Sequence, residues 1–249
     1  MLASWVKGGL FMTSTAVAIW IAIVIVAVIV VVSIFTVRAS RRREAMVQTW
    51  AAARNYTYLK SNSSMVGYVR GLPFTGNENE RVQEFISGAT PGGRSFASFK
   101  YTYDETSSQA SDDGDTQQTT TIDYAVVSMR LPARLPSLSV TRRSFLDKLA
   151  KLFGGQDIVF ESTEFNKMYR VKSDNEPFAY GVFQPQTLDW FMGPAQCIVP
   201  FVMRNTDMFC WHKGRPDYTT LESQLQWMEG FIDQIPQFAI DQFGEALPL

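Results

Sequence analysis

The most prominent feature of the hydrophobic pattern is an unbroken apolar stretch near the N-terminus. No residue from Gly8 to Val37 is charged, and residues 16–32 are almost all β-branched, alanine or tryptophan. A helix over residues 13–37 is about 37 Å long, enough to cross a hydrocarbon core of about 30 Å with some tilt. The pattern predicts a transmembrane helix at 13–37, because a single segment in lipid can satisfy its backbone amides only as a helix. A short non-cytoplasmic N-terminus, residues 1–12, precedes it.

The flanks of this stretch predict its orientation. Lys7 stands alone before it, whereas Arg38, Arg41, Arg42 and Arg43 follow it directly. Positive flanks favour the cytoplasmic side, so we expect the rest of the chain in the cytoplasm, anchored in the plasma membrane. A cleaved signal peptide is the competing interpretation, but its apolar core is normally only about 7 to 15 residues long.

After a basic juxtamembrane helix at 38–55, the pattern predicts one cytoplasmic α+β domain over residues 56–249. Short strand-like segments joined by turns favour antiparallel pairing over helical crossovers. The expected strands are 56–59, 65–69, 82–86, 95–104, 120–131, 157–161, 168–172, 198–204 and 208–212. The expected amphipathic helices are 139–155, two pieces after Asp174 with the second starting at Pro185, and a last one from a capping box at Thr219 and Glu222.

Two hairpins are predicted within this domain. In the first, 95–104 pairs with 120–131, because large apolar residues alternate with polar ones on both segments. The polar, Ser-rich segment 105–118 between them is expected to be a flexible loop. The second hairpin turns at Asn205 and Thr206, so that paired residues sum to 411 and Phe201 lies opposite Cys210.

Basic residues are concentrated in two places that could contact an anionic surface. One is the arginine cluster Arg41, Arg42 and Arg43, and the other is the expected helix at 139–155. The basic side chains of that helix are Arg142, Arg143, Lys148 and Lys151. The alternatives are a topology signal for the first group and an ordinary solvated helix face for the second.

Charge is distributed unevenly along the chain. The formal net charge is −1, with 23 basic and 24 acidic residues, and this balance argues against a nucleic-acid partner. Residues 1–43 carry +5, residues 44–215 are neutral, and residues 216–249 carry −6. The sequence therefore describes a polarised protein, tethered at a basic end and acidic at the other.

Candidate chemistry is sparse. The chain has one histidine and two cysteines without CxxC or HExxH spacing, and no phosphate-loop or dinucleotide fingerprint, so we expect no metal and no cofactor. His212 and Cys210 lie two apart on one expected strand, about 7 Å from each other, which is too far for a direct dyad. Trp211, between them, is a candidate aromatic contact for a partner.

The densest polar group is a corner at Glu161, Ser162, Glu164 and Asn166. Two carboxylates three residues apart could perform acid–base chemistry if a cleft raised the pKa of one. The structural alternative is a strand-end corner whose side chains bond the backbone while Phe165 fills the core.

Several short motifs resemble a family of uncharacterised bacterial proteins with one N-terminal transmembrane helix and a cytoplasmic domain of unknown function. They are Gly71 to Phe74 with Gly76, Phe99-x-Tyr101-x-Tyr103, Leu131-Pro132 with Leu135-Pro136, and Glu161 to Asn166 with Tyr169, Val171, Asp174, Phe178, Ala179 and Pro185. The resemblance covers residues 45–235 and implies the same architecture, but no catalytic residue.

Three functional hypotheses follow. The first is a membrane-anchored, non-catalytic accessory or adaptor protein that binds a protein partner, a membrane complex or a lipid surface. The second is a membrane-tethered hydrolase or transferase that uses Glu161, Glu164 or His212. The third is a structural subunit in which the transmembrane helix itself is the interface.

Overall fold

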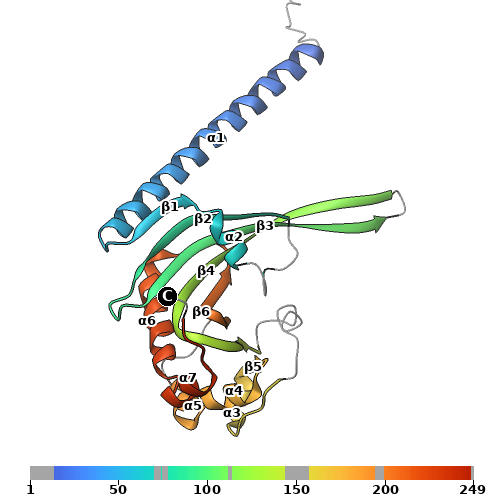
Figure 1. Ribbon diagram of the computed structural model, residues 1–249. Coiled ribbons are helices and arrows are strands. Elements are labelled where there is room, and N and C mark those ends of the chain that lie inside the picture. The colour runs from blue at the N-terminus through green and yellow to red at the C-terminus, as the bar shows by residue number, and fades with distance from the viewer. Residues whose placement is uncertain are drawn as a thin grey trace, which may run out of the picture. The chain divides into compact units, whose positions relative to one another are not determined.

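The computed structural model describes residues 14–69, 74, 78–111, 114–143, 157–193 and 199–247, and side chains for all of these except 14–18 and 107–116. The chain divides into two compact units, residues 1–48 and 49–249. A long apolar helix is followed by an antiparallel sheet of six strands with several helices (Figure 1), which confirms the predicted α+β class.

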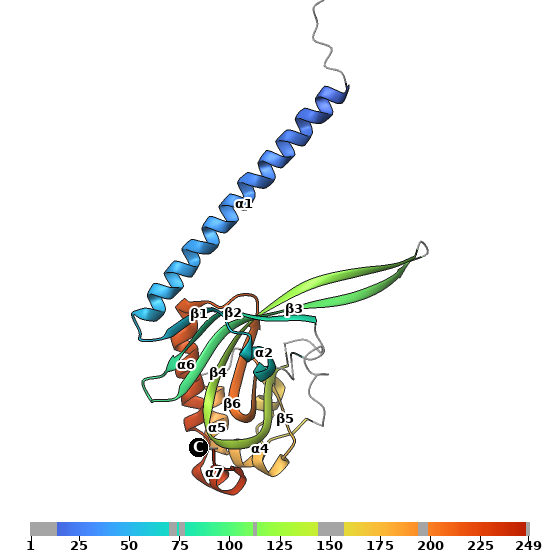
Figure 2. The same ribbon diagram turned by 45° about the horizontal axis from the view of Figure 1, so that its top comes forward.

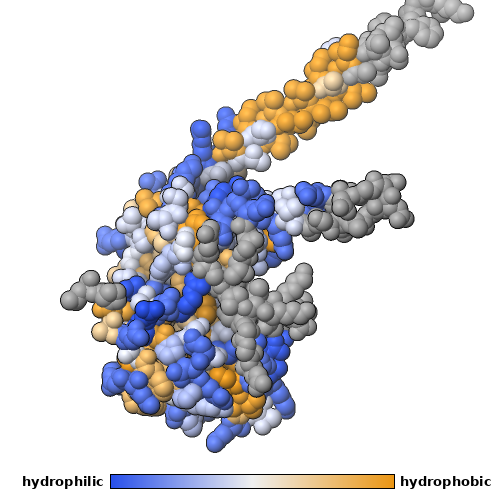
Figure 3. Space-filling view, turned by 45° about the vertical axis from the view of Figure 1, so that its right-hand side comes forward, coloured by the Kyte–Doolittle hydropathy of each residue, from blue (hydrophilic) through white to orange (hydrophobic). Residues whose placement is uncertain are grey.

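Helix α1 (Ser14–Ala52) contains the predicted apolar segment and continues through the basic residues that follow it. An 18-residue window of this helix has a mean hydropathy of 3.1. By length and composition, the helix is long and apolar enough to cross a membrane. Its apolar surface is visible in Figure 3. The hydroxyls of Ser33 and Thr36 donate to the carbonyls of Ile29 and Ser33, at 2.7 and 2.9 Å, so the helix satisfies its own polar groups.

Four strands follow one another as antiparallel neighbours, namely β1 (Thr57–Ser61), β2 (Glu78–Ala89), β3 (Ser95–Ser111) and β4 (Gly114–Arg142). Strands β5 (Tyr169–Ser173) and β6 (Phe201–Lys213) both pair with β4. The predicted pairing of 95–104 with 120–131 is confirmed, with Tyr101 opposite Tyr124. The strands expected at 56–59, 82–86 and 168–172 are also present, the first and last shifted by one residue.

The flexible loop predicted at 105–118 is wrong. The pairing of β3 with β4 continues from Glu105 opposite Thr120 to Ser111 opposite Gly114. These residues form a two-stranded extension beyond the rest of the sheet (Figure 1), which we call the β3–β4 ribbon. Its polar composition is what a strand with two solvated faces requires, so polarity alone did not distinguish it from a loop.

Strand β6 doubles back on itself. The Trp211 amide donates to the Pro200 carbonyl at 3.4 Å, although a fully extended chain would separate these residues by about 35 Å. Asn205, with φ of 56°, lies at the turn in the left-handed region. The predicted hairpin at Asn205 is therefore confirmed, and Trp211 and Pro200 have the expected sum of 411.

Strand β4 bends around this hairpin. Its residues Tyr124–Arg130 pair with one limb of β6 and Leu138–Val140 with the other, so the limbs of β6 lie inside the bend of β4 (Figure 2). The register between β4 and β6 shifts on both sides of Leu135. Pro132 and Pro136 lie in this stretch. Neither has a backbone N–H to donate to a neighbouring strand, so regular hydrogen bonding between β4 and β6 is interrupted here.

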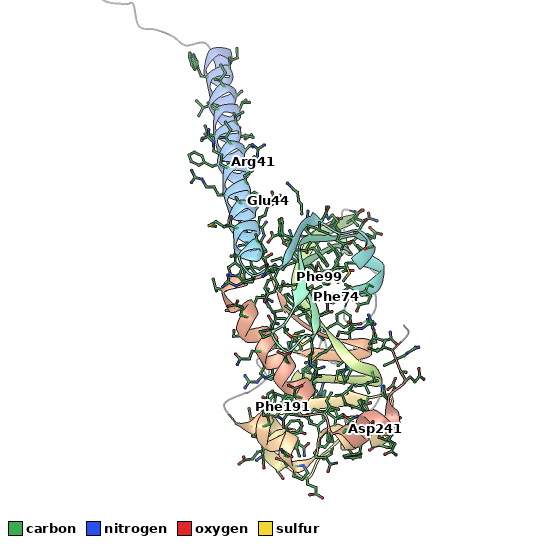
Figure 4. All side chains as sticks on the ribbon, turned by 60° about the vertical axis from the view of Figure 1, so that its left-hand side comes forward. Arg41, Glu44, Phe74, Phe99, Phe191 and Asp241 are labelled. Atoms are coloured by element: carbon green, nitrogen blue, oxygen red, sulfur yellow. The ribbon has the colours of Figure 1, made fainter. Side chains whose placement is uncertain are left out.

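The sheet has two covered faces. On the face that we call the α2 face, helix α2 (Ser64–Val69) and Phe74 cover the alternating aromatic residues of β3. Phe74 lies 4.8 Å from Tyr101 between ring centroids, and Figure 4 shows it beside Phe99. A strand had been predicted at 65–69, which is wrong. Val66 and Val69 gave it strand character, but these side chains pack on the sheet from a helix.

The opposite face, the α6 face, is covered by helix α6 (Tyr218–Asp233). Its Phe231 packs on Phe201 at 4.9 Å, and Trp227 stacks on Phe231 with an interplanar angle of 7°. The predicted apolar stripe of α6 is buried. Its N-cap is Asp217, whose carboxylate accepts from the Thr219 amide at 3.0 Å, so the capping box expected at Thr219 is wrong.

The remaining helices are α3 (Thr163–Met168), α4 (Glu176–Val182), α5 (Pro185–Met192) and α7 (Gln237–Phe243). The two helical pieces after Asp174 are confirmed, with Pro185 as the first residue of α5. The helix predicted from Ser139 is wrong over 139–142, which belong to β4, and the residues from 144 to 155 lie outside the described part. The strand expected at 157–161 is reduced to one bridge between Ile158 and Val171.

The left-handed backbone at Asn205 gives a test of the β6 hairpin. Asn205→Gly should change the free energy of unfolding by less than about 0.5 kcal/mol, because glycine adopts positive φ freely. Asn205→Val should cost about 1–3 kcal/mol. Chemical denaturation of both variants measures the difference, and the opposite order of stabilities would indicate an ordinary extended strand at this position.

Candidate functional site

The predicted basic residues are divided between the two units of the chain. Arg41 and Arg42 are exposed on α1 and Arg43 is half-buried (Figure 4 labels Arg41). Arg142 lies at the end of β4, with its guanidinium 5.9 Å from the centroid of the Tyr169 ring. Arg142 is in strand β4 and Arg143 in the turn after it, so the predicted basic helix face is wrong for these two residues. Lys148 and Lys151 lie outside the described residues, and a binding role for them stays a prediction.

Arg143 belongs to the polar corner. Its Nε donates to the Asn166 carbonyl at 2.7 Å, and its Nη2 lies 3.4 Å from the Asp157 carboxylate. Arg170 contacts the same carboxylate at 3.0 Å. The sequence did not associate Arg143 with the corner, because it was assigned to a helix that does not form over these residues.

The corner uses its polar side chains to hold the backbone. The side-chain amide of Asn166 donates through Nδ2 to the Phe160 carbonyl at 2.6 Å, and its Oδ1 accepts from the Phe160 backbone N–H at 3.0 Å. The side chain thus makes the two hydrogen bonds that a neighbouring strand would make. Ser162 caps α3 by accepting from the Phe165 amide at 3.2 Å, and Phe165 is completely buried. These contacts agree with the structural alternative for the corner.

The two carboxylates of the corner, Glu161 and Glu164, are both exposed to solvent. A catalytic carboxylate with a raised pKa requires burial or a close like charge. The geometry of the corner therefore favours a structural role over acid–base chemistry.

Of the three candidate residues Cys210, Trp211 and His212, the first two are buried in the domain. Trp211 is only 1% exposed and lies on the α2 face among the core aromatic residues, so the prediction that it contacts a partner is wrong. Cys210 is fully buried, and Cys197 lies outside the described residues. The half-buried His212 has its Nδ1 3.2 Å from the Lys213 carbonyl.

A groove on the α2 face, missed at the sequence level, is the more distinctive candidate for a binding site. Its volume is about 330 Å³, close to the lower limit for small-molecule sites. It is lined by residues of α2, by the first residues of β3 and by residues in the middle of β4 and β6. The lining residues are Met65, Tyr68, Ser95, Phe96, Ala97, Ser128, Arg130 and Asp207.

A network of hydrogen bonds forms the polar end of this groove. Asp207, only 6% exposed, accepts from Thr206 at 2.6 Å and lies 3.5 Å from Nη1 of Arg130. The same Arg130 nitrogen donates to Thr206 at 3.0 Å. Burial, together with a hydrogen bond to Asp207, raises the pKa of the Tyr68 hydroxyl, which therefore stays protonated and able to donate.

Arg204 approaches the network from beside the groove. Its Nη2 donates to the Tyr68 carbonyl at 3.3 Å and its guanidinium lies 5.6 Å from the centroid of Phe209. Burial lowers the pKa of Arg204, and the nearby Tyr68 and Asp207 oppose this shift. Asp207, Arg130 and Arg204 converge only through the β4–β6 pairing, which is why no sequence motif indicated them.

Comparisons with known proteins give one informative likeness. No protein-family model matches the chain, and no curated protein sequence matches it. A crystal structure of the mycobacterial trehalose monomycolate transport factor A is similar to this chain, with a TM-score of 0.51 and 9% sequence identity. The similarity covers 82% of this chain and 96% of that one. At this identity the likeness establishes a shared fold, and the family suggested by the short motifs stays a prediction.

The polar corner yields a direct test of its structural role. Asn166→Ala should lower the free energy of unfolding by about 1–3 kcal/mol, because it leaves the two backbone groups of Phe160 without this partner. Glu164→Gln on the same helix is the matched control and should change it by less than about 0.5 kcal/mol. Equal effects in chemical denaturation would contradict the role assigned to Asn166.

Proposed function

We propose that the protein is a membrane-anchored, non-catalytic accessory protein whose domain lies in the cytoplasm and binds a protein partner, a membrane complex or a lipid surface. The observation that carries the proposal is α1, one helix with an exposed apolar surface long enough to cross a membrane, followed by a folded domain. The arginines after the apolar segment support the cytoplasmic orientation.

The character of the domain supports an accessory role. Glu161 and Glu164, the candidate catalytic acids, are exposed to solvent. The side chains of their neighbours Ser162 and Asn166 form hydrogen bonds with backbone groups. The neighbour with the same fold is described as a transport factor, a name that suits an accessory protein. The groove between α2 and the sheet offers a concave surface for recognition.

The alternative function is a membrane-tethered hydrolase or transferase that uses Glu161, Glu164 or His212. The exposure of the two glutamates speaks against it, because an exposed site does not exclude water from the reaction. His212 would need a nucleophile, and the nearby thiol of Cys210 is buried.

The orientation has a direct test by protease protection in membrane vesicles. In right-side-out vesicles the domain should resist protease until detergent is added, whereas in inverted vesicles it should be digested. Changing Arg38, Arg41, Arg42 and Arg43 to Gln and adding lysines beside Lys7 should invert part of the population. Neutralising Arg81, which belongs to strand β2 of the folded domain, is the control and should leave the orientation unchanged. Digestion of the wild-type domain from the outside would contradict the proposal.

Partner binding can be tested by crosslinking in the native membrane followed by affinity purification of the full chain. If the domain is the binding part, replacing residues 14–37 with an unrelated apolar span should retain the captured partner. Loss of the partner in that variant would instead favour the helix as the interface. A free monomer, with no partner and no dependence on lipid, would remove the support for an accessory role.

A further inference from the structure

We propose that the groove on the α2 face binds the anionic headgroup of a small amphiphile, such as a phosphate or carboxylate that carries an apolar chain. This inference rests on the proposed binding role and adds the chemical class of the ligand. Its observations are the shape of the groove, the surplus of positive charge at one end, and the apolar wall beside it.

The hollow exists because its floor is made of small residues. Along β3 and β4 the α2 face carries Phe99 and Val126, which are fully buried, but at the groove the corresponding positions are Ala97 and Ser128. Ala97 is paired with Ser128, so the two small side chains lie directly opposite each other. Side chains of this size leave space under α2 that larger ones fill farther along the sheet.

The polar end of the groove is positively charged overall. Arg130 and Arg204 both interact electrostatically with Asp207, whose single charge neutralises only one of them. The Arg130 side chain is 39% exposed, so it is accessible to a ligand. Arg130, in the lining, and Arg204, beside the groove, therefore share one carboxylate, and two guanidinium groups around a single negative charge favour a further anion.

The remaining lining determines the rest of the ligand. Ser95, which is exposed at the groove, has a hydroxyl that can donate to an anion oxygen, whereas the hydroxyls of Tyr68 and Ser128 are already bonded to Asp207 and to the Ala97 carbonyl. Met65 and Ala97 provide an apolar wall next to them. A bare inorganic anion would leave this wall hydrated. An alkyl chain attached to the anion would bury the wall, which contributes a favourable free energy of about 25 cal/mol per Å² of apolar surface buried.

The probe for this inference is hexyl phosphate, with hexanol and inorganic phosphate as its two halves. Binding to the full chain in lipid nanodiscs can be measured by isothermal titration calorimetry. Hexyl phosphate should bind at least about tenfold more tightly than either half, and more weakly as salt increases. Nanodiscs with phosphatidic acid in place of a zwitterionic lipid should compete with the probe if a lipid headgroup supplies the anion. If they do not compete, the source is a soluble amphiphile.

Variants separate the groove from non-specific binding. Arg130→Met should weaken binding of hexyl phosphate at least about tenfold, while Arg134→Met, which removes an exposed arginine from the same strand, should leave it within about twofold. Ser95→Phe places a bulky side chain at an exposed position of the groove and should block it without loss of charge. Circular dichroism verifies that each variant is folded.

Two results would overturn the inference. One is that Arg130→Met and Ser95→Phe, both folded, bind hexyl phosphate as the wild type does. The other is that hexanol or inorganic phosphate binds as tightly as hexyl phosphate. Neither result affects the crosslinking experiment, so failure of the ligand class can be distinguished from failure of the accessory role.

Discussion

The nesting of the β6 hairpin inside the bend of β4 is the constraint on which the rest of the domain depends. Because both limbs of β6 pair with β4, one long strand holds β3 along one part of its length and β5 along another. The same arrangement presents Trp211 to the α2 face and Phe201 to the α6 face, so the two aromatic cores share one hairpin. The bend is also what brings Arg130 to Asp207, since their strands meet just before the register shifts.

Local patterns predicted local structure well. The apolar helix, the pairing of β3 with β4, the hairpin at Asn205 and the start of α5 at Pro185 were all predicted from residue spacing and turn residues. The failures occurred where the local pattern fits two different structures. The apolar residues of α2 suggested a strand because its helix is short and packs on a sheet, and the β3–β4 ribbon was interpreted as a loop because both of its faces are polar.

The candidate site illustrates the same limit. The polar corner could be recognised because its residues are consecutive in the sequence, and of its two interpretations the contacts of Asn166 favour the structural one. The groove could not, because its residues come from four elements and none of them forms a motif. A weak signal did exist. Ala97 and Ser128 are small, whereas Phe99 and Val126, the next residues on the same face of each strand, are large. Only the register of β3 and β4 shows that the two small residues lie opposite each other.

The β3–β4 ribbon has a consequence for how this fold can vary. Adding or removing two residues on each strand of the ribbon preserves the pairing of Tyr101 with Tyr124, and it also preserves the alternation of side chains between the two faces of the ribbon, which has a period of two. Each such step changes the reach of the ribbon by about 7 Å. Because the ribbon extends past the residues that β2 and β6 pair with, its length is uncoupled from the packing of the domain. The ribbon can therefore be lengthened or shortened without a change in the core of the domain.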